Sequence, residues 1–193
     1  ISIKEIIDKF EIKKISKSSS IFSYSKLNFF NNYYLRIPDN INLFDLFCKN
    51  NLLTKKYYHG DKNKIFRIFE VHKKDLNYYE EIIKYIEIYF NQTHKYINNE
   101  NFDNIFNEIL SDFIIKLDSI DEWNLENIDS LINNFLTDKK VKFPIFGKPI
   151  RYILTNSYKG PSITDIFLIL KKKISIERLN LYIIKNNGWL RRY

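Results

Sequence analysis

The chain has 193 residues, 45% of them hydrophobic, which is enough for a sizeable core in one domain or two small ones and excludes disorder throughout. Its 31 Lys and Arg outnumber its 23 Asp and Glu, and the net charge of +8 favours a polyanionic partner such as nucleic acid or an anionic surface. The single cysteine, Cys48, excludes an internal disulfide framework and fits a reducing compartment, and no run of about 18 apolar residues predicts a membrane span.

Four helices are predicted in the first half of the chain. Ser2 and Glu5 have the spacing of a capping box, and the apolar residues around them recur every three or four positions: Ile3, Ile6, Ile7 and Phe10. A second helix is expected over residues 43–48 and a third around residues 65–69, with a break near Asp75. The fourth has a wide apolar face that belongs inside a bundle, formed by Leu76, Tyr79, Ile83, Ile86 and Phe90 and flanked by Tyr78, Ile82, Tyr85 and Tyr89.

The helical period continues through the second half. Residues 102–117 form the clearest predicted helix, and Trp123 precedes another over residues 128–136. Residues 139–147 are expected to be a basic connector in which Pro144 breaks any helix. Pro149 suits the first position of a short helix, because its missing N–H would be unsatisfied there anyway.

The turn at residues 160–161, Gly-Pro, is expected to stop that short helix. Ser162 and Asp165 have the spacing of a capping box ahead of the next helix, and the last helix is expected to start near Ser175 and to end before Gly188. Sustained two-residue alternation is nearly absent. The sequence therefore predicts an all-α protein, with a seam between two helical bundles in the polar loop around residues 92–101.

Recognisable catalytic chemistry is absent from the sequence. It contains no GxGxxG and no P-loop, and His59, His72 and His94 are too far apart to have the spacing of metal ligands. Cys48 lies in the apolar stretch LFDLFC and is expected to be a small core residue rather than a nucleophile. We therefore expect no metal site and no catalytic residue in this chain.

Residues 14–18 read KISKS, one conservative change from the KMSKS loop with which class I aminoacyl-tRNA synthetases hold ATP phosphates. Such a loop stabilises the charge of a transferring phosphoryl group only when a nucleotide-binding fold holds the triphosphate against it. The residues before this stretch are predicted to form one helix and no sheet. KISKS is therefore interpreted as a basic turn between helices.

Residues 2–36 resemble a segment of bacterial-type glutamyl-tRNA synthetases that follows the catalytic domain. The family pattern is a helix ending in KF, a Ser-rich turn, KL, an Asn and YxR, matched here by Lys9, Phe10, Ser16, Ser18, Lys26, Leu27, Asn31, Tyr34 and Arg36. Phe30 departs from the family's usual residue before the Asn. In this family the segment closes the stem-contact region and leads into the anticodon-binding domain.

The far end of the chain is similar to the second anticodon-binding bundle of the same family. Its PLR, LT, GP and RL signatures are matched by Pro149, Ile150 and Arg151, by Leu154 and Thr155, by Gly160 and Pro161, and by Arg178 and Leu179. Two glycines of the family are replaced, by Asn156 and Lys171. Asn tolerates a positive φ and can keep the turn, whereas Lys does so less readily.

The resemblance implies a cage of the anticodon-binding type, divided into the end of the stem-contact region (1–36), a first helical bundle (37–98) and a second helical bundle (99–193). Unpaired loop bases are read by stacking and by hydrogen bonds, while Lys and Arg contact phosphates. The residues expected to bind tRNA are Arg151, Thr155, Asn156, Gly160, Pro161, Lys148, His72, Lys73, Lys74, Lys26 and Arg36.

Two of these residues have alternative interpretations. Arg151 offers a planar donor fork to RNA, and its alternative role is to brace the second bundle. His72 stands where the family commonly has an Arg that is associated with reading an anticodon base. It is interpreted either as a base-reading residue or as a plain histidine on the helix surface.

The resemblance also implies that the chain is the C-terminal part of a glutamate–tRNA ligase, a monomer in a bacterial cytoplasm or an organelle. It would bind tRNA-Glu, with tRNA-Gln as a second candidate, and no membrane. ATP and Mg²⁺ are expected in an N-terminal catalytic domain outside this chain, which itself binds no cofactor; the lack of an initiating Met fits a piece of a longer protein. The alternatives are a stand-alone, non-catalytic RNA-binding or ribosome-associated module derived from that enzyme, and a basic helical scaffold for protein partners.

Overall fold

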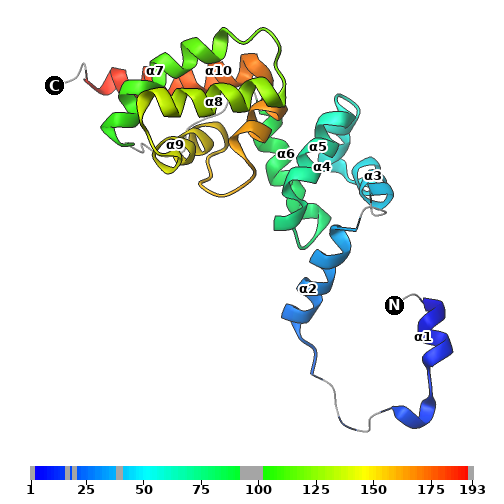
Figure 1. The fold of residues 1–193 in the computed structure, drawn as a ribbon. Coiled ribbons are helices and arrows are strands. Elements are labelled where there is room, and N and C mark those ends of the chain that lie inside the picture. The colour runs from blue at the N-terminus through cyan, green and yellow to red at the C-terminus, as the bar shows by residue number, and fades with distance from the viewer. Residues whose placement is uncertain (1–2, 16–17, 19–20, 38–40, 92–101, 191–193) are drawn as a thin grey trace.

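A computed structural model describes residues 3–15, 18, 21–37, 41–91 and 102–190, and every regular element in these ranges is a helix (Figure 1). The predicted all-α fold class is confirmed. The predicted seam at residues 92–101 lies outside the described residues, as do Ser2 and Ser16. The boundaries drawn at residues 36 and 98 stay predictions.

The helices follow one another along an extended molecule (Figure 1). The N-terminal segment contains α1 (Ile3–Lys9), the 3₁₀ turn η1 (Ile12–Lys14) and α2 (Tyr24–Leu35). The first bundle contains α3 (Ile41–Asn50), α4 (Leu52–Tyr58), α5 (Lys62–His72) and α6 (Ile82–Phe90), with the 3₁₀ turns η3 (Lys73–Asp75) and η4 (Tyr79–Glu81) between α5 and α6. The second bundle contains α7 (Asn104–Asp118), α8 (Leu125–Lys139), α9 (Phe143–Thr155) and α10 (Ile163–Leu190).

Aromatic rings form the centre of each bundle. In the first, the rings of Phe44 and Phe69 stack with their centroids 4.0 Å apart, and both are fully buried. In the second, the Phe113 ring lies edge-on to Phe146 at 4.7 Å and to Phe135 at 5.2 Å. Such rings bury large apolar areas and fix the helices around them. Cys48 is fully buried in the first core, as predicted, and burial raises the pKa of its thiol to about 12.

Two helices of the N-terminal half were absent from the prediction. α2 begins at the N-cap Ser23, whose side chain accepts a hydrogen bond from the Lys26 amide, and its aromatic residues are spread around the helix rather than along one stripe. α4 is only seven residues long and begins because the Asn51 side chain accepts from the amides of Leu53 and Thr54. Neither helix has the one-sided apolar pattern on which the prediction relied.

The apolar residues of α1 lie on the surface. The capping-box pattern predicts a helix here and α1 confirms it, but Ile6, Ile7 and Phe10 are 53%, 67% and 60% exposed. Periodicity shows that a face is apolar and cannot show what it packs against. The described bundles leave this face uncovered.

The helix α9 corrects the interpretation of residues 139–149. It begins at Phe143, so Pro144 lies in the first helical turn and does not break a helix, while Pro149 lies inside the helix. A proline is tolerated in the first turn because the N–H that it lacks has no helical partner there. The connector is much shorter than predicted. α8 ends at Lys139, and its C-cap Lys140 adopts a left-handed conformation (φ 54°).

A break precedes the last helix close to its predicted start, whereas its predicted end is wrong. α10 runs from Ile163 to Leu190, so Gly188 does not end it, and its one non-helical residue is Lys171 (φ 64°, ψ 164°), four residues before the predicted start at Ser175. The capping box at the start of α10 is confirmed: the Asp165 amide donates to Ser162 Oγ at 3.0 Å. In the first bundle, α6 begins six residues after Leu76, because the segment 76–81 is extended and then 3₁₀.

Candidate nucleic-acid interface

The two bundles meet where the end of α5 faces the loop between α9 and α10, residues 156–162, called here the α9–α10 loop. A Cβ atom placed on Gly160 would lie 3.8 Å from Cε1 of His72 and 4.0 Å from Cδ of Arg151. Three residues expected to bind tRNA, from three different elements, are thus brought together. We call this meeting point the bundle junction.

The α9–α10 loop has a fixed conformation. α9 ends at Asn156, which takes the left-handed conformation expected for it (φ 55°) and donates its amide to the Tyr152 carbonyl at 2.7 Å. The Ser157 hydroxyl accepts from the Lys159 amide at 3.1 Å and donates to the Lys159 carbonyl at 2.8 Å. Gly160 has a φ of 142°, which residues with a Cβ rarely adopt, so glycine is required at this point of the loop.

Arg151 ties the loop to α9, and Thr155 bonds back to Arg151 within the helix. The Thr155 hydroxyl donates to the Arg151 carbonyl at 2.8 Å and is buried. Arg151 donates from Nε to the Pro161 carbonyl at 3.1 Å and from Nη1 to the Tyr158 carbonyl at 3.3 Å. These bonds fit the alternative role of Arg151 as a brace, and they leave its Nη2 without a hydrogen-bond partner in the described part of the chain.

His72 is buried at the bundle junction, with only 3% of its surface exposed. Its ring stacks on Tyr85 at 3.7 Å between centroids, and Nε2 lies 3.2 Å from the Tyr89 hydroxyl. Nδ1 has no hydrogen-bond partner among the described residues. Burial, with a smaller effect of the Lys84 charge, lowers the pKa of His72 to about 4, so the ring is neutral at neutral pH.

The alternative of a plain helix-surface histidine is therefore wrong, because the last turn of α5 packs its His72 face onto α6 instead of facing solvent. In this form of the protein the ring is covered by Tyr85 and Tyr89. A contact between His72 and an RNA base stays a prediction, and it requires those aromatic side chains to move.

Basic residues lie near the junction residues along the chain. Lys73 and Lys74 follow His72 directly; Lys73 pairs with Glu70 at 2.7 Å, whereas Lys74 is exposed. Lys148 is exposed on α9, three residues before Arg151, a spacing that places both on one helix face.

The two remaining predicted residues, in and just after α2, differ in their relation to this group. Arg36 donates from Nη2 to the Lys74 carbonyl at 3.0 Å and so ties the end of α2 to η3. Asn32 supports the same attachment by donating to the Leu76 carbonyl at 2.6 Å. Lys26 is exposed in the first turn of α2, the end that points away from the bundles, and the structure does not bring it to the bundle junction (Figure 1).

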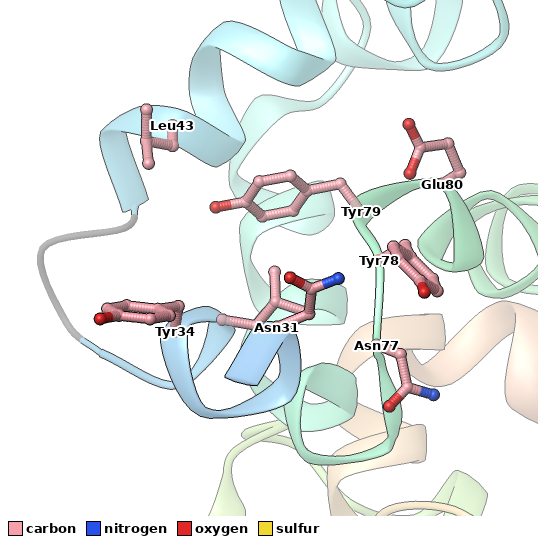
Figure 2. Close-up of a pocket in the computed structure, with 8 residues that line it drawn as sticks. Asn31, Tyr34, Leu43, Asn77, Tyr78, Tyr79 and Glu80 are labelled. Carbon is pink, nitrogen blue, oxygen red and sulfur yellow. The ribbon is translucent and has the colours of Figure 1, made fainter. Parts of the chain in front are cut away.

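An open pocket of about 330 Å³ lies where α2 meets the first bundle (Figure 2). The side chains that line it are mainly apolar or aromatic: Asn31, Tyr34, Leu35, Leu43, Asn77, Tyr78, Tyr79 and Glu80. Beside it, the Tyr78 hydroxyl donates to Asn28 Oδ1 at 2.6 Å. None of the residues expected to bind tRNA lines this pocket.

Sequence reasoning missed the side chains that join the two bundles. Arg67 of α5 pairs with Asp165 of α10 at 2.5 Å, and Arg178 of α10 reaches carbonyl groups of both bundles. Arg178 had been matched to a family signature without a role. Its signal in the sequence was a permanently charged residue next to Leu179 on the buried face of a helix.

The described ranges contain neither a membrane-spanning helix nor a metal-binding cluster. No helix there is long and apolar enough to cross a membrane. No three His, Cys, Asp or Glu side chains in those ranges come together in a way that could hold a metal ion.

The sequence model of the family described as the anticodon binding domain matches residues 45–183. The chain is 27% identical over 187 residues to a glutamate–tRNA ligase of Mycoplasma capricolum and 28% identical over 188 residues to one of Mycoplasma mycoides; each match covers 93% of this chain and 38% of the relative. The chain thus spans well under half the length of these curated relatives.

Two solved structures share the fold. A glutamate–tRNA synthetase from Elizabethkingia anophelis superposes with a TM-score of 0.74 at 22% identity, over 95% of this chain and 36% of that protein. A glutamate–tRNA ligase from Elizabethkingia meningosepticum, solved in complex with its amino acid, gives a TM-score of 0.75 at 22% identity. With residues 45–183 matched, the chain belongs to the anticodon binding domain family, in the form found in glutamate–tRNA ligases.

Proposed function

We propose that this chain binds the anticodon stem and loop of a tRNA, as the anticodon-binding part of a glutamate–tRNA ligase. The observation that carries the proposal is the match of the anticodon binding domain family to residues 45–183, most of both bundles. The bundle junction supports the proposal, since exposed lysines lie near its residues along the chain and hydrogen bonds hold its loop in place.

The cations are suited to phosphate contacts. Lys74, Lys148 and the unpaired Nη2 of Arg151 lie on or next to the two elements that form the bundle junction, and Lys74 and Lys148 are exposed. If these three groups each neutralise one phosphate, the logarithm of the tRNA association constant falls with the logarithm of salt concentration with a slope of about −2 to −3. This sequence-independent attraction would supply most of the affinity.

The α9–α10 loop is suited to contact with unpaired bases. Tyr158 is 43% exposed and stacks on Tyr152 with centroids 4.6 Å apart, so its ring is held in a fixed orientation at the surface. An extruded base stacks on such a ring without a large loss of side-chain freedom. The preference for tRNA-Glu over tRNA-Gln would come from groups of this loop together with His72.

The aminoacylation reaction belongs, in this proposal, to a catalytic domain outside the chain that binds ATP, glutamate and Mg²⁺. The chain alone is then inactive in aminoacylation and in ATP–pyrophosphate exchange. In the described part of KISKS, Lys14 belongs to a 3₁₀ turn and pairs with Glu11 at 2.6 Å, which supports the interpretation as a basic turn. The bacterial sources of the relatives support a bacterial cytoplasm, and the proposed form is a monomer.

The test is a filter-binding titration with tRNA-Glu and an unrelated tRNA. The purified chain is expected to bind tRNA-Glu more tightly, and Arg151→Ala is expected to weaken that binding about tenfold, because it removes a charged donor and loosens the loop. Lys116→Ala is the matched control: it removes one positive charge on α7 that already faces Asp138 at 3.5 Å. Equal affinity for both tRNAs, with no effect of Arg151→Ala, would reject anticodon recognition.

A further inference from the structure

Arg178 is 2% exposed although its guanidinium carries a permanent positive charge. It lies on α10, and its neighbours on the same buried face are apolar or small, with Ser175 and Leu179 both fully buried. Burying a charge is unfavourable unless it is compensated by well-placed partners. The hydrogen-bond partners of Arg178 therefore indicate its structural role.

Three backbone carbonyls accept hydrogen bonds from Arg178, and they come from both bundles. Nη1 donates to the Leu154 carbonyl, in the last turn of α9 in the second bundle. Nη2 donates to the carbonyls of Ile88 at 2.7 Å and Asn91 at 3.0 Å, at the C-terminal end of α6 in the first bundle. One guanidinium, itself almost fully buried, thus joins the two bundles.

The charge of Arg178 is balanced by helix ends. The last carbonyls of a helix have no partner within the helix and carry a partial negative charge. The C-terminal ends of both α6 and α9 contact the Arg178 side chain. An arginine fits this arrangement because its planar fork presents several donors in fixed directions, so that one side chain satisfies carbonyls from separate helices.

The bend at Lys171 brings Arg178 to this place. The one non-helical residue of α10 divides it into residues 163–170 and 172–190, and the Ser175 hydroxyl donates to the Lys171 carbonyl at 2.9 Å across the bend. A second polar contact between the bundles is more exposed. Arg67 and Asp165 form an ion pair with side chains that are 48% and 25% exposed, and such pairs contribute little.

We propose that Arg178 is the positioning residue that fixes the orientation of the first bundle relative to the second, and with it the spacing of the phosphate-binding cations at the bundle junction. This inference rests on the proposed tRNA function for its consequence and on the buried hydrogen bonds for its cause. Without Arg178, one buried and two partly buried carbonyls lose this donor. The bundles then sample several orientations, and only some of these fit a tRNA hairpin.

The orientation can be measured directly with spin labels on the full chain. Lys56→Cys on α4 and Asn134→Cys on α8 place one label on an exposed site of each bundle, and Cys48 stays unlabelled because it is buried. Pulsed electron resonance is expected to give one narrow distance distribution for the parent and a broad one for Arg178→Met. Arg178→Lys, which keeps the charge but not the fork, should restore part of the narrow distribution, and Arg67→Met, which breaks only the surface pair, should leave it narrow.

Binding of tRNA-Glu is measured on the same variants. If the competent orientation falls to about a tenth of the population, the apparent Kd rises about tenfold. A distribution that stays narrow in Arg178→Met, or a broad one with unchanged affinity, overturns the inference. Loss of the helical circular dichroism in both Arg178→Met and Arg178→Lys also overturns it, since the residue would then be needed for the helices themselves. If the parent binds no tRNA while Arg178→Met still broadens the distances, the proposed function fails and the orienting role stands.

Discussion

Replacing Lys171 by glycine is expected to raise the free energy of unfolding by about 1 kcal/mol. Lys171 has φ 64° and ψ 164°, a region that essentially only glycine occupies and that costs another residue about 1–3 kcal/mol. Glycine removes that strain but makes the unfolded chain more flexible, which costs about 0.4–1 kcal/mol. The side chain of Lys171 is exposed, so its loss removes no buried contact. For a chain of this size a gain of about 1 kcal/mol raises Tm by about 2–4 °C.

Urea unfolding followed by far-ultraviolet circular dichroism measures this change. Lys171→Ala is the first control, because alanine removes most of the side chain and keeps the strain; its midpoint should stay near that of the parent. Lys173→Gly is the second control: it makes the same replacement at an exposed helical site two residues away, where it should destabilise by about 1 kcal/mol. If Lys171→Gly and Lys173→Gly shift the midpoint in the same direction, the strain argument is refuted.

Three further predictions concern buried or half-buried polar groups. The pKa of His72 is about 4 in the folded chain and about 6.5 in the unfolded chain, so below pH 6.5 the unfolded state binds more protons and the free energy of unfolding falls as the pH is lowered. Between about pH 7.5 and 4.5, urea titrations should show the parent losing about 2–3 kcal/mol more than His72→Gln, and an equal loss in both proteins would contradict the burial of His72. Trp123→Phe removes the 3.1 Å hydrogen bond from the indole N–H to the Phe167 carbonyl and should cost about 1 kcal/mol in the same assay; no change would mean that this bond contributes nothing. The Cys48 thiol, whose pKa burial raises to about 12, should react with a thiol reagent only in denaturant, and fast labelling of the native chain would show that the first core opens.

The sequence predicted helices well where the helix itself lies in a bundle core. The stripes of residues 102–117 and 128–136 correspond to α7 and α8, since both helices pack one face inward and the apolar period records that face. α2 could not be found in this way, because Phe29, Phe30 and Tyr33 are all exposed and no single face is apolar. The prolines misled the boundary of α9 because proline is compatible with the first helical turn, and its position within a helix depends on where the helix begins.

The candidate site was predicted through motifs, and its geometry was not. The family signatures singled out Arg151 and Gly160, which the structure places beside His72, although nothing in the sequence relates residue 72 to residue 160. The burial of His72 under Tyr85 and the contacts of Arg178 with α6 and α9 depend on packing between distant segments. Contacts between distant segments cannot be predicted from a local sequence pattern. The sequence therefore predicted which residues belong to the site but did not predict the role of each.

The exposed isoleucine and phenylalanine side chains before α2 affect how the protein behaves when purified. The exposed fractions are 77% for Ile12, 95% for Ile21 and 66% for Phe22. Apolar surface of this extent favours concentration-dependent aggregation. A shortened protein that starts at Ser23, the N-cap of α2, would lack these exposed apolar residues. It would keep both bundles and the hydrogen bond through which Arg36 attaches α2 to the first bundle. Such a version should stay dispersed at the high concentrations that spectroscopy and crystal growth demand.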